Sequence, residues 1–212
     1  MVTPLPVTQA ENRTNPAIAD DEVLAYYDHL ALCLKRVEVT AQDGTTLSQG
    51  EALTTVIGWA RASHAAGRKL MFIGNGGSAG ICSHMATDYS KAGNLRAMAF
   101  NDGAMLTCLG NDLGYEQVFA RQIEMHGADG DMLIAISSGG RSRNILEGVA
   151  AARRRGCRVV SLSGFDGDNP LRRLGDVNFH LASDQYGTVE IGHLAICHAI
   201  LDFACGQKVP KA

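Results

Sequence analysis

The stretch LMFIGNGGSAGICSHMATDY, residues 70–89, joins a short apolar run to a glycine-rich turn and then to a polar segment. The apolar run LMFIG predicts a strand that is buried on both faces. The glycines of GNGGSA let the backbone approach a ligand, and a helix that starts there points its first N–H groups toward an anion. His84 and Asp88 are four residues apart on that predicted helix, so they share one face. This stretch therefore predicts a strand–turn–helix unit with a binding loop at its centre.

Short apolar segments of the same kind recur along the chain. The five segments are residues 69–75, 95–101, 131–138, 158–164 and 177–183. Most of them are separated by stretches of helical length, which are residues 79–91, 102–127 and 142–156. Buried strands that alternate with helices are typical of a parallel sheet covered on both faces. We therefore predict an α/β fold with a five-stranded parallel sheet in a three-layer, flavodoxin-like αβα sandwich.

Helical patterns also flank the predicted sheet. Residues 20–39 and 46–67 precede it, the second pattern ending at Gly67, which is a usual stop residue, and residues 190–206 follow it. The first pattern carries an apolar stripe at Val23, Leu24, Tyr27, Leu30, Ala31 and Leu34. The sequence thus predicts an N-terminal helical extension on a single domain over residues 19–212, after a flexible tail at residues 1–18.

Composition narrows the class of protein. The 212 residues are 46% hydrophobic and 19% charged with a net charge of −3, which disfavours nucleic acid or an anionic membrane as the main partner. The six cysteines are scattered without a C-x-x-C pair, as in reduced cytosolic proteins. The N-terminus lacks the pattern of a signal peptide, and no apolar run approaches ~20 residues. We expect a cytoplasmic protein without a membrane partner.

A second loop, ISSGGRSRN at residues 136–144, follows the third predicted strand. Its serine hydroxyls at a helix start suit a phosphate monoester, and the first loop lies at an equivalent place in the sheet, where ligands of open α/β folds bind. Either loop alone is as well explained by a capped turn, but the pair favours a ligand site. The predicted substrate-binding residues are Asn75, Gly76, Gly77, Ser78, Asp102, Ser137, Ser138 and Ser142.

A dinucleotide site is a weaker alternative for the first loop. Gly74, Gly76 and Ala79 fit the G-x-G-x-x-A pattern, but the candidate acidic residue, Asp102, lies further along than the usual ~20 residues. The second loop has no role in that scheme.

Four motifs together resemble the sugar isomerase (SIS) domain family, and within it the phosphoheptose isomerases. They are GNGGSA, CLGNDLGYEQVF, ISSGGRSRN and VEIGHLAICHAIL, and the resemblance covers residues 20–203. It implies that Ser78, Ser137, Ser138 and Ser142 hold a sugar phosphate. The usual second loop has a serine and an asparagine where this chain has Gly139 and Arg141, so the pocket is expected to lose a hydroxyl and gain a cation.

The resemblance also implies a metal and an acid–base pair. Many relatives bind zinc with residues that match His84, Asp88, Glu190 and His198; two of the four are altered here, from Glu to Asp and from Gln to Glu. By the same resemblance Asp88 is the base and His198 the acid, with Glu190 as an alternative base. His193 is a further candidate ligand, although a lone histidine on an apolar helix is more often a core residue.

The predicted function is therefore aldose–ketose isomerisation through an enediol, which needs a base, an acid and a stabilised oxyanion. The resemblance implies sedoheptulose 7-phosphate and D-glycero-D-manno-heptose 7-phosphate as the sugars, zinc as the cofactor, and a homotetramer. It further implies active sites shared between chains, with last-helix residues of one chain facing first-loop residues of another. The apolar stripe of the first helix also favours pairing with a second copy. A non-catalytic SIS protein, either a sugar-phosphate sensor or a replication-initiator-associating adaptor, stays open as the alternative.

Overall fold

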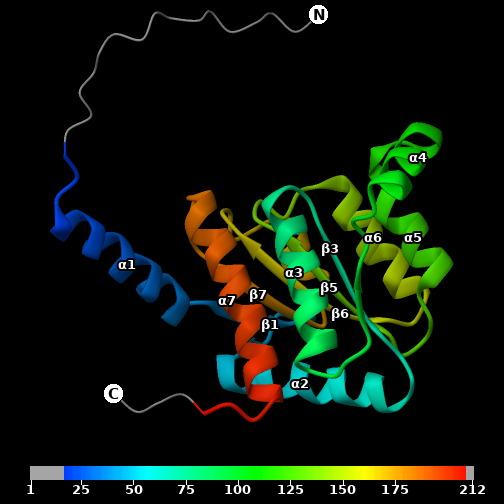
Figure 1. The fold of residues 1–212 in the computed structure, drawn as a ribbon, viewed down its shortest axis with the longest axis horizontal. Helices are drawn as coiled ribbons and strands as arrows, with labels where there is room; N and C mark the ends of the chain where they lie inside the picture. The colour runs from blue at the N-terminus through cyan, green and yellow to red at the C-terminus, as the bar shows by residue number, and fades with distance from the viewer. Residues whose placement is uncertain (1–16, 209–212) are drawn as a thin grey trace, which may run out of the picture.

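Seven strands form one mixed sheet with helices on both faces in the computed structural model, which describes residues 17–208 (Figure 1). The strands are β1 (Glu38–Ala41), β2 (Thr46–Leu47), β3 (Leu70–Gly74), β4 (Ala97–Ala99), β5 (Met132–Ser137), β6 (Arg158–Gly164) and β7 (Val177–Leu181). The helices are α1 (Asp20–Lys35), α2 (Gln49–Ala65), α3 (Gly77–Lys91), α4 (Gly103–Leu113), α5 (Val118–His126), α6 (Arg143–Arg154) and α7 (Tyr186–Ala204), with short 3-10 helices η1 (Tyr115–Gln117) and η2 (Pro170–Arg173).

The five predicted strands all form, as β3 to β7, and they pair in parallel in the order β7-β6-β5-β3-β4. This is the flavodoxin-like order, with the first predicted strand inside the second. The prediction of a five-stranded, wholly parallel sheet is nevertheless wrong, because two antiparallel strands extend it. β1 pairs with β7, with Val39 opposite Phe179, and β2 pairs with β1.

The antiparallel hairpin also shortens the first helix. Residues 20–39 were expected to be helical, but α1 ends at Lys35, and Val37 and Val39 are buried instead. The two hairpin strands turn at Asp43 and Gly44, and Gly44 has a φ of 87°. Asp-Gly is a hairpin signal, but strands of two and four residues are too short to show a clear period of two.

Glycines end two of the other helical patterns. Gly67, with a φ of 72°, follows α2 and confirms the predicted stop. The long pattern over residues 102–127 is broken at Gly114, whose φ of 90° separates α4 from η1 and α5. An L-residue with a side chain is strained at such angles, so the chain turns there. The last helix starts at Tyr186, before the predicted residue 190.

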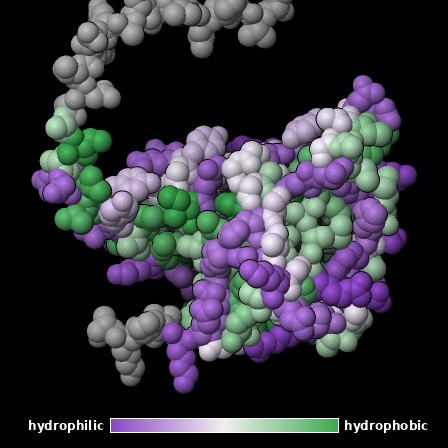
Figure 2. Space-filling view, viewed as in Figure 1, coloured by the Kyte–Doolittle hydropathy of each residue, from purple (hydrophilic) through white to green (hydrophobic). Residues whose placement is uncertain are grey.

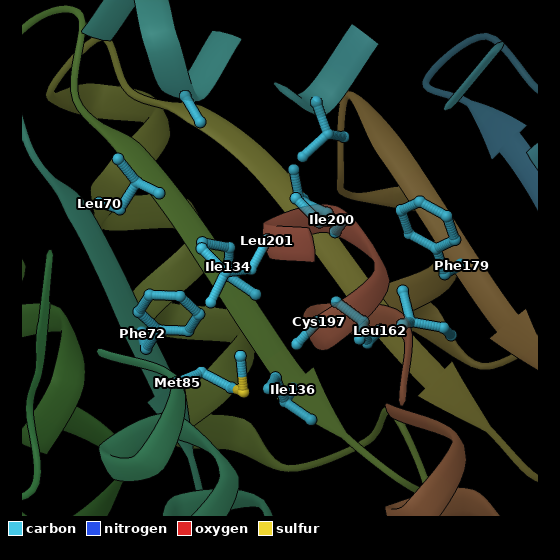
Figure 3. Close-up of a cluster of buried hydrophobic side chains, with 14 of the residues drawn as sticks. Leu70, Phe72, Met85, Ile134, Ile136, Leu162, Phe179, Cys197, Ile200 and Leu201 are labelled. Carbon is cyan, nitrogen blue, oxygen red and sulfur yellow. The ribbon is translucent and has the colours of Figure 1, made fainter. Parts of the chain in front are cut away.

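Hydrophobic residues fill both faces of the sheet. On one face α2, α3 and α7 pack over the strands, and Figure 3 shows this cluster around Phe72, Met85 and Leu201. On the other face Phe119 of α5 and Val149 of α6 cover the strands. All residues of β3 and β5 are buried, so their carboxyl ends are held rigidly where the two glycine and serine loops begin.

α1 lies apart from these layers and extends away from the body of the chain (Figure 1). It has no buried residue, and Leu24 and Tyr27 of its apolar stripe are 63% and 58% exposed. Figure 2 shows hydrophobic residues gathered along α1 and on the adjoining surface. Most of the predicted tail, residues 1–16, lies outside the described residues. Of the helices in the described range, none has the length and apolarity needed to cross a bilayer.

Candidate active site

A pocket lies at the carboxyl ends of β3 and β5, and we call it the serine pocket. Its lining residues are Asn75, Gly76, Gly77, Ser78, Ser137, Ser138, Gly139, Ser142, Tyr186 and Glu190. Seven of the eight predicted substrate-binding residues are among them, Asp102 being the exception. Ser78, Ser137 and Ser138 are buried, so their hydroxyls are held in place by the surrounding chain. Ser142 stands at the N-cap of α6 without a side-chain capping bond, which leaves its hydroxyl for a ligand.

The first loop brings bare backbone into this pocket. Gly76, with a φ of 54°, precedes α3 and has no side chain to cap it. At the start of α3 the Ala79 N–H donates to the backbone carbonyls of Asn75 and Gly76. The preceding N–H groups, of Gly77 and Ser78, have no backbone acceptor in the part of the chain that the structure describes and are therefore available to a ligand. A Cβ at Gly74 would come within 2.8 Å of Ser78, so only glycine allows this close turn. Such a helix start favours an anion.

A pair of amides joins the two loops. Asn75 Nδ2 donates to Asn144 Oδ1 at 2.9 Å, and Asn144 Nδ2 donates back to Asn75 Oδ1 at 2.8 Å. The hydroxyl of Tyr115 also donates to Asn75 Oδ1, at 3.0 Å. Asn144 is buried, so these bonds are shielded from water. Sequence reasoning missed Asn144 and Tyr115 as individual site residues, although both lie in motifs that carry the family resemblance.

The expected extra cation does not enter the serine pocket. The Arg141 guanidinium points to Asp166 and Asp168, with nitrogen–oxygen distances of 3.4 and 3.1 Å, and Arg141 is not a lining residue. Gly139 does line the pocket, where it contributes no hydroxyl. Among the described lining residues there is no lysine, arginine or histidine.

Three of the four predicted metal-site residues converge on α3 and α7, the two helices that also contribute to the serine pocket, and we call them the histidine cluster. His84 Nε2 lies 3.4 Å from Asp88 Oδ2, and the His84 and His198 rings are 5.3 Å apart between centroids. One potential ligand atom from each of the three residues lies within 4.8 Å of the others. Within this one chain the three residues are brought together by α3, which carries His84 and Asp88, and α7, which carries His198.

The remaining candidates lie elsewhere. Glu190 lines the serine pocket and is not among the three clustered residues. His193 is fully buried, and its Nε2 lies 3.1 Å from the carbonyl oxygen of Ser163. Burial lowers the pKa of His193 to about 4, so this ring is a neutral core residue. Asp102 caps α4 by accepting a hydrogen bond from the Met105 N–H at 2.8 Å.

Known proteins match both the sequence and this geometry. The SIS domain family matches residues 25–164. The phosphoheptose isomerase of Geobacter sulfurreducens is 38% identical over 154 residues, which are 70% of this chain and 81% of that protein. The chain belongs to the phosphoheptose isomerase family of SIS-domain proteins.

Other members of the phosphoheptose isomerase family match nearly as well. The phosphoheptose isomerase of a Bradyrhizobium species is 37% identical over 182 residues, covering 82% of this chain and 89% of that protein. The solved phosphoheptose isomerase of Neisseria gonorrhoeae superposes with a TM-score of 0.75 at 27% identity, over 88% of this chain and 98% of that one. The resemblance inferred from the four motifs is thereby confirmed.

Proposed function

We propose that this protein is an aldose–ketose isomerase that interconverts sedoheptulose 7-phosphate and D-glycero-D-manno-heptose 7-phosphate. The observation that carries the proposal is the presence of two sites on the same pair of helices, α3 and α7: a serine pocket suited to a phosphate, and a histidine cluster suited to proton transfer. A sugar phosphate has a chemically distinct group at each end. The family relationship supports the same activity.

In this proposal the serine pocket holds the phosphate. The hydroxyls of Ser78, Ser137, Ser138 and Ser142 and the free N–H groups at the start of α3 donate to its oxygens. Asp102, which does not line the pocket, acts at most through the loop that follows β4. The amide pair of Asn75 and Asn144 keeps the two loops at a fixed separation, so the donors are arranged before the ligand arrives.

Isomerisation moves a proton between neighbouring carbons of the sugar. In this proposal Asp88 acts as the base and His198 as the acid. His84, in contact with Asp88 at 3.4 Å, orients the carboxylate. Aspartate is shorter than the glutamate of the resembling family, and a misplaced base can cost ~10²-fold in rate unless the backbone compensates. Glu190 is the alternative base, although it lies toward the serine pocket.

The histidine cluster also fits a zinc ion. Two imidazoles and a carboxylate are ligands that zinc accepts, and a fourth position would be open to substrate. When bound, zinc would polarise the substrate carbonyl as a Lewis acid. Protein purified without chelators is expected to hold about one zinc per chain by elemental analysis, and His84→Ala is expected to lose it. Metal-free protein with full activity would contradict this part of the proposal.

We further propose a homotetramer in which α1 packs on a neighbouring copy. The exposed apolar stripe of α1 supports association, because a helix without a buried face gains little stability from its own chain. His84 and Asp88 are 51% and 30% exposed, so a neighbour that covers them would complete a site shared between chains. All six cysteines are free, in keeping with the proposed cytoplasmic location.

The test is an isomerase assay with sedoheptulose 7-phosphate in deuterated water. Turnover through an enediol places deuterium on the carbon next to the carbonyl, and NMR detects it. Asp88→Asn should retain phosphate binding while losing the exchange. Binding of the sugar phosphate by the unaltered protein with neither exchange nor product would reject the isomerase and favour the sensor.

A further inference from the structure

Glu190 is a carboxylate in a pocket otherwise built from groups that bind anions. It stands in the second turn of α7, half-buried, and lines the serine pocket together with Ser78, Ser137 and Ser138. Its carboxylate lies directly against Gly77, the first residue of α3, where an added Cβ would overlap with both carboxylate oxygens. The negative charge of Glu190 therefore stands at the start of α3, beside the N–H groups that would receive a phosphate.

This charge is not neutralised by a neighbour. Among residues 17–208, no hydrogen-bond or ion-pair partner of the Glu190 side chain is found, and the pocket lining contains no cation. Arg141, the cation of the second loop, is held by Asp166 and Asp168. α3 has no acidic residue in its own first turn, so Glu190 is the negative group next to the positive end of this helix dipole.

A bare phosphate and a sugar phosphate differ in how they meet such a carboxylate. A phosphate that carries nearly two negative charges at pH 7.5 is repelled by Glu190. Hydroxyl groups on the carbons next to a phosphate ester can donate to the same carboxylate in strong, charge-assisted hydrogen bonds. The Glu190 carboxylate repels both ligands, but only the hydroxylated ester can offset this repulsion with hydrogen bonds to the carboxylate.

From these contacts we infer that Glu190 is a specificity-determining residue, which excludes inorganic phosphate from the serine pocket and selects phosphate esters with hydroxyl groups near the phosphate. The inference rests on the proposed function, because it assumes that the serine pocket is the phosphate site. It gives the pocket a selectivity that serine hydroxyls and backbone N–H groups alone do not provide, since those bind any phosphate.

The experiment measures two ligands by calorimetry on the full chain as purified, at low salt and pH 7.5. The ligands are inorganic phosphate and glucitol 6-phosphate, which has the hydroxyl groups but no carbonyl and so cannot be isomerised. Glu190→Gln removes the charge and keeps the size of the side chain. We expect it to bind inorganic phosphate about tenfold more tightly, or ~1.4 kcal/mol, and to lose at least tenfold of the preference for glucitol 6-phosphate.

Two further variants fix the interpretation. Glu147→Gln, the same charge change on α6 away from the pocket lining, should leave both dissociation constants within about twofold. Adding Ser137→Ala and Ser142→Ala to Glu190→Gln should abolish the gain, which places it in the serine pocket.

The two possible failures can be told apart. Unchanged or weaker phosphate binding in Glu190→Gln, with the serine variants still reducing the binding of glucitol 6-phosphate, would overturn the role of Glu190 and leave the phosphate site in place. Binding of both ligands that is insensitive to the serine variants would overturn the phosphate site itself.

Discussion

The serine pocket and the histidine cluster lie on the same two helices, α3 and α7, yet they are built in opposite ways. The pocket uses buried hydroxyls, backbone N–H groups and an amide pair that joins its loops. The cluster uses titratable side chains in the middle of the helices, where His84 is 51% exposed. One site is fixed by the backbone, and the other by the rotamers of three side chains.

This difference suggests a division of labour. A rigid pocket binds the phosphate equally in the ground state and the transition state, so damage there should raise KM more than it lowers kcat. Groups that transfer protons act only in the transition state, so damage to the cluster should lower kcat. The following variants test whether changes in the serine pocket mainly affect KM and changes in the histidine cluster mainly affect kcat.

The largest expected effect is that of His198→Ala. Loss of a positioned general acid should lower kcat by ~10²–10⁴-fold with a smaller change in KM. Steady-state kinetics on sedoheptulose 7-phosphate measures both. His126→Ala, an exposed histidine at the end of α5, is the matched control and should keep the parent kcat. Equal kcat values for the two variants would show that His198 is not the general acid of the reaction.

The double variant Ser137→Ala/Ser142→Ala should weaken binding of the sugar phosphate at least tenfold while the fold stays intact. If the phosphate binds as proposed, each hydroxyl donates a hydrogen bond to a charged group, worth ~1.5–3 kcal/mol. Calorimetry gives the dissociation constant, and circular dichroism the fold. An unchanged dissociation constant would place the phosphate outside the serine pocket.

Asn144→Ala tests whether the link between the loops matters for binding. It removes two hydrogen bonds to Asn75, each worth ~0.5–1.5 kcal/mol net, so we expect KM to rise about threefold to tenfold with kcat nearly unchanged. Asn111→Ala, an exposed asparagine on α4, is the control. A fall in kcat with constant KM would mean that this pair supports the chemistry instead of the pocket.

The smallest expected effect is in a mixing experiment, in which we expect two inactive variants to regain no isomerase activity when they are combined. Asp88→Asn and His198→Ala chains that are mixed and refolded together should stay as inactive as each variant alone. Asp88 and His198 cluster within one chain, so every site in the mixture would still lack one of the two residues. Exchange of chains must first be shown by mass spectrometry. Activity above that of both parents would instead support the arrangement implied by the family resemblance, in which the two residues of one site come from different chains.

Some structural elements could be predicted from the sequence, and others could not. The five parallel strands and the two loops were predicted because buried strands and glycine-rich turns are local patterns. The β1–β2 hairpin was missed because its pairing with β7 is made across most of the chain, with Glu38 opposite His180. Arg141 was expected in the pocket because its position in the loop was known, but the aspartates that hold it lie on another loop.

The sequence by itself determined the fold class, the family and the loops that follow β3 and β5, since these depend on periodicity and on residues adjacent in the chain. Only the tertiary structure decided which side chains of α7 reach which site: Glu190 enters the serine pocket, His198 joins His84, and His193 is buried in the core. Spacing along a helix fixes the relative angle of these residues, but not the rotation of the helix on the sheet. That rotation is set by the packing of Cys197, Ile200 and Leu201 into the core, which sums contacts from the whole chain (Figure 3).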